Sequence, residues 1–311
     1  MERIQTAIEK ARARREREML VLEPSQSLGT GQLAPAVAEQ QPVQPVAVPT
    51  PVSDTAEATV TDSAADSELS EQPRKVAWSK LKPIMPNPGH LVRNRILTLH
   101  GGRDAVLFDQ IRTKVLQTMR SNKWTRLAIT SPSPECGKST LAMNLGFSLA
   151  RQPDLCSMLL EFDLRRPSLT KLLGKPVEKG IVPWLEGRIP FAEQALCYND
   201  NFALALCSQP LSNASELSLQ NRTASALSQL EAEYRPDLVI FDMPPMQASD
   251  DMMAFASQVD CVLIVAAAES TTVKQIDACE RDLAAQTNVM GVVLNKCEYL
   301  DPETGYGYYY S

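Results

Sequence analysis

The sequence predicts an α/β domain built on a mostly parallel β-sheet with helices on both faces. Two observations lead to this fold class. Short apolar runs alternate with longer segments of helical periodicity between about residues 105 and 295, and the runs are apolar almost throughout, as in strands covered on both sides. The expected strands are residues 127–130, 158–162, 202–207, 238–242, 261–266 and 289–294, and the expected helices are residues 105–121, 139–151, 221–233, 250–258 and 273–286.

The chain before this domain divides into two segments. Residues 1–22 place Ile4, Ile8 and Ala11 at helical spacing beneath a basic surface. This amphipathic N-terminal helix fits a solvated helix as well as a helix that docks on a partner or an anionic membrane surface. Residues 23–77 follow, without Lys, Arg or aromatic residues up to position 73, so we expect a disordered linker there.

Composition narrows the functional classes. The 311 residues carry a net charge of −6, which argues against a broad nucleic-acid-binding surface. The chain has no run of about 18 apolar residues and no apolar signal-peptide core, so we expect a cytoplasmic protein. The seven cysteines include no C-x-x-C pair and predict neither a disulfide framework nor a zinc site. We place the folded domain at residues 78–298 and a flexible tail at residues 299–311.

The strongest motif, TSPSPECGKST at residues 130–140, lies between an expected strand and an expected helix. This is the context of a P-loop, in which a glycine lets the backbone approach phosphate and helix N–H groups bind the anion. We expect Lys138 to reach the β- and γ-phosphates of ATP and Ser139 to join the Mg²⁺ shell. A lone GKST occurs by chance, and Pro132 replaces the usual first glycine, but the flanking strand and helix make chance a poor explanation. The predicted nucleotide-binding residues in this loop are Pro134, Glu135, Cys136, Gly137, Lys138, Ser139 and Thr140.

Two acidic strand ends extend the expected site. Glu161 and Asp163 lie two residues apart on one side of the extended chain, just before two arginines. Alone this pair would suit a solvated loop, but beside a P-loop it favours phosphate and metal binding. A second apolar run closes on Asp242, in the pattern of a carboxylate that holds Mg²⁺. The predicted catalytic residues are Lys138, Glu161, Asp163 and Asp242, the predicted metal ligands are Ser139, Glu161 and Asp242, and the predicted contact of the adenine base is Asn295.

Tyrosines are concentrated at the C-terminal end of the chain. Five of the seven lie in the last thirteen residues, among glycine spacers. Aromatic side chains on a flexible tail have no packing role, so they suit either docking on a partner or phosphorylation. Because the same chain carries an expected ATP site, we predict phosphorylation at Tyr306, Tyr308, Tyr309 and Tyr310.

Together these motifs resemble the bacterial tyrosine kinases (BY-kinases) of capsule and exopolysaccharide biosynthesis. The resemblance covers about residues 95–311 and rests on the P-loop, DLRRP from Asp163, DMPP from Asp242, residues 213–217, VLNK at residues 293–296 and the tyrosine tail. The chain departs from the family in three places. The usual Pro-Gly-Glu-Gly-Lys stretch of the P-loop reads Pro-Glu-Cys-Gly-Lys at residues 134–138. The family usually has Asp where this chain has Glu161, and its Glu-x-x-Arg-x-x-Arg pattern, which contacts a neighbouring subunit, is reduced to Arg112, with Val106 and Asp109 at the other positions.

The resemblance implies a P-loop NTPase-like fold, ATP and Mg²⁺ as cofactors, and tyrosine autophosphorylation between subunits that controls polymer length or export. It also implies an activator, the cytoplasmic segment of a membrane-embedded polysaccharide co-polymerase, which would recruit the protein to the inner face of the cell membrane. Self-association and a phosphotyrosine phosphatase are further implied partners. Two other functions remain open: a non-catalytic ATP-binding adaptor of the co-polymerase, and a partitioning-type ATPase switch.

Overall fold

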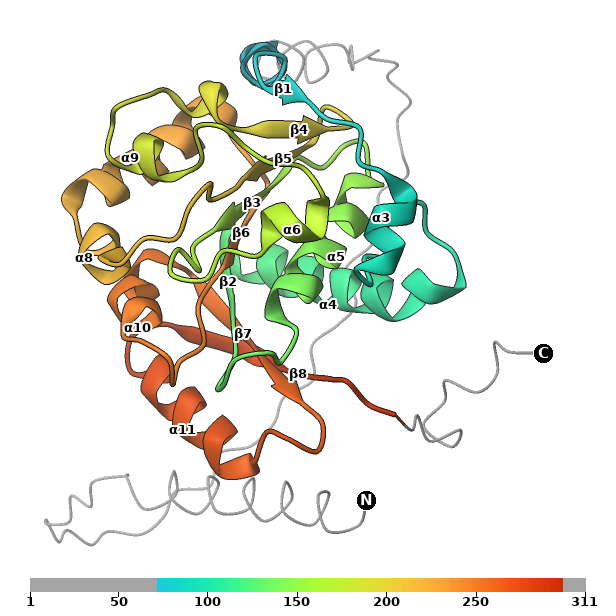
Figure 1. Cartoon of the computed structure of the whole chain (residues 1–311), viewed down its shortest axis with the longest axis vertical. Coiled ribbons are helices and arrows are strands. Elements are labelled where there is room, and N and C mark those ends of the chain that lie inside the picture. Colours follow the sequence, from blue (N-terminus) through green and yellow to red (C-terminus); the bar gives the residue numbers. More distant parts are fainter. Residues whose placement is uncertain (1–71, 299–311) are drawn as a thin grey trace, which may run out of the picture. The chain divides into compact units, whose positions relative to one another are not determined.

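The structure is a computed structural model, and it describes residues 72–298. The predictions for residues 1–22, for the linker up to residue 71 and for the tail at residues 299–311 lie outside the described residues. The predicted P-loop NTPase-like α/β fold is confirmed. Within the described residues, one eight-stranded sheet is covered by helices on both faces (Figure 1).

The sheet has the strand order β1-β4-β5-β3-β6-β2-β7-β8. Every neighbouring pair is parallel except β4 and β5, which are antiparallel. All six expected strands are present, each within two residues of its predicted ends. The strands are β1 (Lys82–Pro83), β2 (Arg126–Thr130), β3 (Ser157–Glu161), β4 (Leu196–Tyr198), β5 (Phe202–Ala205), β6 (Leu238–Asp242), β7 (Cys261–Ala267) and β8 (Asn288–Asn295).

The helices form two layers. In Figure 1, α3 to α6 lie on one side of the sheet and α8 to α11 on the other. The α-helices are α3 (Pro88–Arg93), α4 (Val106–Asn122), α5 (Lys138–Ala150), α6 (Leu169–Leu173), α7 (Val182–Leu185), α8 (Ala214–Ser218), α9 (Asn221–Tyr234), α10 (Asp251–Phe255) and α11 (Val273–Ala284). The five expected helices are among them, and the last three residues of the fourth, Ala256–Gln258, are a 3-10 turn.

Each face of the sheet has its own apolar core. Beneath α4 and α5, buried side chains such as Val115 and Leu141 pack on β-strand residues including Ile240. On the other face, Leu230 of α9 and Phe255 of α10 pack in a separate cluster. Burying a large apolar side chain stabilises a fold by about 1.5–3 kcal/mol, so the two clusters fix the central strands between the helical layers.

Two features of the fold differ from the sequence prediction. Residues 72–78 are helical, and Ala77 and Trp78 are buried, so the folded part begins before residue 78. Strand β4 was not predicted because three residues are too few to produce a recognisable apolar run. It forms through a tight hairpin with β5, in which Asn199 and Asp200 adopt the left-handed conformation that these residue types tolerate.

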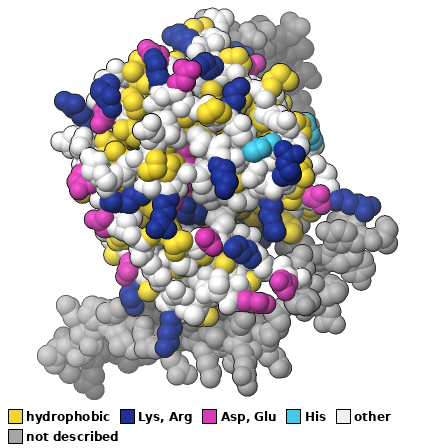
Figure 2. Space-filling view, viewed as in Figure 1, with side chains coloured by type: hydrophobic (Ala, Val, Ile, Leu, Met, Phe, Trp, Pro, Cys, Tyr) yellow, Lys and Arg dark blue, Asp and Glu magenta, His cyan; other side chains and the backbone are white. Residues whose placement is uncertain are grey.

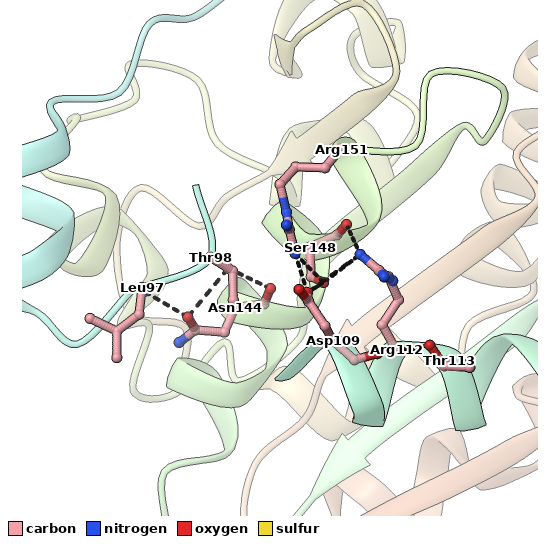
Figure 3. A network of polar contacts seen from close by, with 8 residues as sticks. All are labelled: Leu97, Thr98, Asp109, Arg112, Thr113, Asn144, Ser148 and Arg151. Atoms are coloured by element: carbon pink, nitrogen blue, oxygen red, sulfur yellow. Dashed lines mark hydrogen bonds and ion pairs between the residues drawn. The ribbon is translucent and has the colours of Figure 1, made fainter. Parts of the chain in front are cut away.

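Helix α5, which follows the P-loop, is fixed by polar contacts on two sides (Figure 3). On one side, the Asn144 side chain accepts from Leu97 N–H at 2.8 Å and donates to Arg95 O at 2.9 Å. On the other, Asp109 of α4 accepts hydrogen bonds from Ser148 of α5 and from Arg151, the residue that follows α5. These contacts hold the helix whose N-terminus carries the candidate phosphate site.

Candidate nucleotide site

The phosphate-binding loop connects the end of β2 to the start of α5, at the C-terminal edge of the sheet. Gly137 has φ +93°, and a Cβ atom there would lie 2.1 Å from Asn295 Nδ2. The position therefore requires glycine for both conformation and space. The next residue, Lys138, is the first residue of α5, so the free N–H groups of the helix start are available to an anion at this point.

The ammonium group of Lys138 lies between two carboxylates in a buried environment. Its Nζ atom is 2.7 Å from Asp163 Oδ2 and 3.9 Å from Asp242 Oδ1. The side chain is enclosed, with Lys138 only 8% exposed. Burial would lower the pKa of Lys138, but the charges of Asp242 and Asp163 outweigh it and raise the pKa, so the group is cationic.

Asp242 ends β6, directly beside the end of β3. Its backbone carbonyl accepts hydrogen bonds from Phe162 N–H at 2.9 Å and Asp163 N–H at 2.8 Å, which ties the two strand ends together. Its carboxylate is fully buried, and neither oxygen has a hydrogen-bond partner among residues 72–298. Burial raises the pKa of the Asp242 carboxyl, and the charge of Lys138 opposes this.

A buried carboxylate with free oxygens is the type of group that a hard divalent cation binds. The described residues contain no cluster of three or more His, Cys, Asp or Glu side chains that could hold a metal by themselves. A Mg²⁺ ion here would therefore depend on Asp242, on the Ser139 hydroxyl and on phosphate oxygens of a nucleotide. This donor set fits the P-loop type of metal site.

Glu161 does not face the phosphate loop. Its Oε1 accepts from the backbone N–H groups of Ser168 and Leu169, and its Oε2 accepts from Cys207 N–H at 2.8 Å. The side chain is fully buried. Of the two carboxylates at the end of β3 and just beyond it, Asp163 contacts Lys138 and Glu161 is directed to the backbone of neighbouring segments.

Arg165 has a partner that the sequence did not indicate. Its guanidinium forms a two-point ion pair with Asp251 of α10, with Nε–Oδ2 at 2.8 Å and Nη2–Oδ1 at 3.0 Å. The Ser249 hydroxyl donates to the same carboxylate at 2.8 Å. The pair joins the loop after β3 to the segment after β6 across 86 residues of sequence, and no local pattern predicts such a contact.

A pocket of about 560 Å³ opens above these groups. One wall is the P-loop, the opposite wall comes from the loops after β3 and β6, and neither Glu161 nor Cys136 lines it. Such a volume is typical of small-molecule sites at the C-terminal edge of a parallel sheet. The lining residues are Pro134, Glu135, Gly137, Lys138, Ser139, Thr140, Asp163, Arg165, Arg166, Ser168, Leu172, Pro244, Pro245, Ala248, Ser249 and Lys296.

Similar proteins are known from sequence and structure, although no family model matches the chain. The chain is 28% identical over 187 residues to the tyrosine-protein kinase etk of Escherichia coli, covering 60% of this chain and 25% of that protein. It is 27% identical over 207 residues to the candidate tyrosine-protein kinase CapB of Staphylococcus aureus, covering 65% of this chain and 88% of that protein. The solved kinase domain of Escherichia coli ETK matches with a TM-score of 0.55 and 25% identity, covering 64% of this chain and 79% of that domain.

In sequence and in fold the chain is similar to these bacterial tyrosine kinases. It spans about a quarter of the length of etk and most of the length of CapB. Within its described residues, every helix is too short or too polar to cross a bilayer.

Three further residues singled out from the sequence have defined positions in the structure. Asn295, the predicted base contact, donates from Nδ2 to Cys136 O at 2.9 Å and so supports the P-loop backbone. The Cys136 thiol is only 1% exposed and lies 3.6 Å from the hydroxyl oxygens of Ser133 and Thr271, behind the loop. Arg112 donates to Ser148 O at 3.1 Å, so it is bonded within its own subunit (Figure 3).

Charged side chains are mixed over the face shown in Figure 2, where basic residues are spread among acidic and apolar ones. This face has no continuous basic stripe of the kind that follows a nucleic-acid backbone. The predicted phosphorylation sites Tyr306, Tyr308, Tyr309 and Tyr310 lie outside the described residues.

Proposed function

We propose that this protein is an ATP-dependent protein-tyrosine kinase that phosphorylates tyrosines of its own C-terminal segment and thereby regulates exopolysaccharide or capsule assembly. The observation that carries the proposal is the buried Lys138 between Asp163 and Asp242 at the base of a P-loop pocket. The names of the relatives support the kinase class, and the tyrosine cluster supplies acceptors in the same chain.

The residues of the pocket suggest a division of roles. N–H groups at the start of α5 would bind the phosphates, and Lys138 would neutralise charge on the transferred group. Ser139 and Asp242 would hold Mg²⁺, which supplies further charge neutralisation when bound. When Lys138 turns from Asp163 to the nucleotide, the freed Asp163 carboxylate can accept the proton of an incoming tyrosine hydroxyl.

The proposed partners follow from the family. The activator would be the cytoplasmic segment of a membrane-embedded polysaccharide co-polymerase, which recruits the kinase from the cytoplasm to the inner face of the membrane. Self-association would bring the tyrosines of one copy to the pocket of another, and a phosphotyrosine phosphatase would reverse the reaction. Because Arg112 is bonded to α5 and the other two positions of the subunit-contact pattern are changed, we expect self-association to depend on other surfaces.

The test is phosphotyrosine formation in the full chain incubated with Mg-ATP and the co-polymerase segment. Lys138→Met should abolish the phosphotyrosine signal, since it removes the cation that contacts Asp163. Lys114→Met, on the exposed face of α4, is the matched control and should retain wild-type signal. A full phosphotyrosine signal in Lys138→Met would refute the proposed role of the P-loop.

An adaptor that binds ATP without transferring phosphate is a second candidate. The observation that favours it is Glu161, which stands where the family usually has Asp and whose oxygens face backbone N–H groups. The same incubation separates the candidates. Tight ATP binding without phosphotyrosine or phosphate release would indicate the adaptor, and phosphate release without phosphotyrosine would indicate an ATPase switch.

A further inference from the structure

We propose that Glu161 is a positioning residue, which holds the loop carrying Asp163 in place by accepting hydrogen bonds from three backbone N–H groups. The inference deepens the proposed function, because it concerns the same site. It rests on that function in one respect only, which is the proposed role of Asp163 as the acceptor of the tyrosine proton. It assigns Glu161 no contact with metal or nucleotide.

The three donors surround the Glu161 carboxylate on two sides. Leu169 N–H lies 2.7 Å from Oε1, and Ser168 N–H donates to the same oxygen. Cys207 N–H donates to Oε2 at 2.8 Å. An oxygen that accepts two N–H groups has used both of its lone pairs, so Oε1 has no capacity left for a metal ion.

These donors belong to two separate segments near the end of β3. Ser168 and Leu169 open α6, which has no capping side chain at its own N-terminus. Helix starts leave N–H groups without intrahelical partners, and Glu161 supplies the missing acceptor. Cys207 follows the end of β5, the strand next to β3. One side chain thus fastens the start of α6 and the segment after β5 to the end of β3.

The hydrogen bonds of Glu161 determine the position of Asp163, because Asp163 lies in the loop whose far end Glu161 binds. The loop begins where Asp163 N–H donates to Asp242 O, and it ends at Ser168, where Glu161 binds. Between them, Arg166 N–H lies 3.2 Å from Asp163 Oδ1. With both ends fastened, the Asp163 carboxylate is held 2.7 Å from Lys138 Nζ.

The length of the glutamate side chain decides whether all three donors can be reached. Aspartate is one methylene shorter, so its carboxylate would retreat by about 1 Å, which takes a 2.8 Å hydrogen bond beyond its normal range. Replacing Glu161 by the aspartate that the family usually has should therefore weaken these hydrogen bonds and the binding of Mg-ATP in this chain. Glutamine has the right length, but its NH2 group would face at least one of the three backbone N–H groups. Two donors cannot form a hydrogen bond with each other.

The experiment compares Glu161→Asp and Glu161→Gln in the full chain, with Glu231→Asp as the matched control. Glu231 pairs with Arg126 by a contact of 2.6 Å, and both residues line a pocket separate from the nucleotide pocket. We measure amide hydrogen exchange in peptides containing Ser168, Leu169 and Cys207, and the affinity for Mg-ATP with a fluorescent nucleotide. Circular dichroism shows that each variant is folded.

Both Glu161 variants should exchange faster in at least one of these peptides and bind Mg-ATP about tenfold more weakly, while the control matches the wild type. The Asp variant should be no better than the Gln variant. Wild-type exchange and affinity in Glu161→Asp would overturn the proposal. Unchanged exchange and affinity in Glu161→Gln, with loss of phosphotyrosine alone, would also overturn it and make Glu161 catalytic.

These readouts do not require phosphate transfer. If the wild type forms no phosphotyrosine but the variants still lose protection and affinity, the kinase assignment fails and the positioning role stands. If the Asp variant does not fold, the Gln variant, which preserves the volume of the side chain, still decides between the outcomes.

Discussion

At the scale of single residues, the site concentrates one buried cation and three buried carboxylates at the C-terminal ends of two adjacent strands. Lys138, Glu161, Asp163 and Asp242 are each no more than 8% exposed. Lys138 stabilises Asp163 directly and Asp242 at a longer distance, while Glu161 depends on backbone donors. Each carboxylate therefore lies in a different environment.

Glu161 should make the stability of the nucleotide-free protein depend on pH. Burial raises the pKa of Glu161 from its ordinary value of 4.5 to about 7, although the backbone donors oppose the shift. Between these two values the folded chain retains a proton that the unfolded chain has lost. The free energy of unfolding should fall as pH rises through this window, by on the order of 3 kcal/mol.

Urea unfolding at several pH values across this window measures the effect. Glu161→Gln should reduce the pH slope, and the slope that remains should come from groups such as Asp242, whose pKa burial also raises. An equal slope in wild type and variant would show that Glu161 is ionised throughout.

Cys136 combines a lowered pKa with low exposure. Burial would raise the pKa of this thiol, but hydrogen bonds with the hydroxyl groups of Ser133 and Thr271 outweigh it. Because the side chain is only 1% exposed, we expect it to react with iodoacetamide more slowly than the exposed Cys297. Peptide mass spectrometry after brief labelling measures both sites, and Cys297→Ser should abolish the fast reaction. Equal labelling rates in the wild type would contradict the expectation.

At the scale of elements, the position of α5 relative to α4 and the preceding loop determines where the P-loop points. Asn144 is fully buried in the middle of α5 and bonds to two residues, Arg95 and Leu97, of the segment that follows α3. The loop after β3 is held in a comparable way, by Glu161 at its end and by the ion pair between Arg165 and Asp251. Polar contacts between elements therefore determine the shape of the site, while apolar packing determines the sheet.

Asn144→Ala should destabilise the domain by about 1–3 kcal/mol, because it removes the partner of the part-buried N–H of Leu97 and of the carbonyl of Arg95. Asn122→Ala is the matched control at the exposed end of α4, where the side chain bonds only to Thr118 O. It should change stability by less than about 0.5 kcal/mol. Chemical denaturation measures both, and similar losses would mean that the α5 contacts are not important.

At the scale of the whole molecule, the described part begins with a helical segment, residues 72–78, which ends on the first residue of the predicted domain. Trp78 is 3% exposed, its indole N–H donates to Tyr234 O at 2.8 Å, and its ring meets the Tyr234 ring edge-on at 6.4 Å. Arg74 also forms an ion pair with Asp237. The segment therefore belongs to the folded unit.

Two truncations test this boundary. Removal of residues 1–71 should leave the thermal stability and Mg-ATP affinity of the domain unchanged, because the described contacts all remain. Removal of residues 1–81 deletes Trp78 and should destabilise the domain by about 3–5 kcal/mol, the range for loss of a buried Trp. Trp78→Ala in the full chain is the check. If it is neutral, the contacts of Trp78 do not account for the loss of stability on truncation.

The sequence by itself determined the parts of the protein that depend on neighbouring residues. Apolar runs placed six strands, and Gly137, Lys138 and Asp242 were predicted as site residues because a phosphate loop and a closing carboxylate are local patterns. The reason is physical: backbone conformation, strand burial and helix starts are each set over a few residues.

Only the tertiary structure decided which carboxylate serves which neighbour. Sequence spacing placed Glu161 and Asp163 on one side of a strand end, and gave no means of telling them apart. Their partners come from elsewhere in the chain: Glu161 binds Cys207, 46 residues away, and Asp163 binds Lys138, 25 residues away. A side chain's role depends on the donors within its reach, and those donors are brought there by the packing of α6, β5 and α5 around β3.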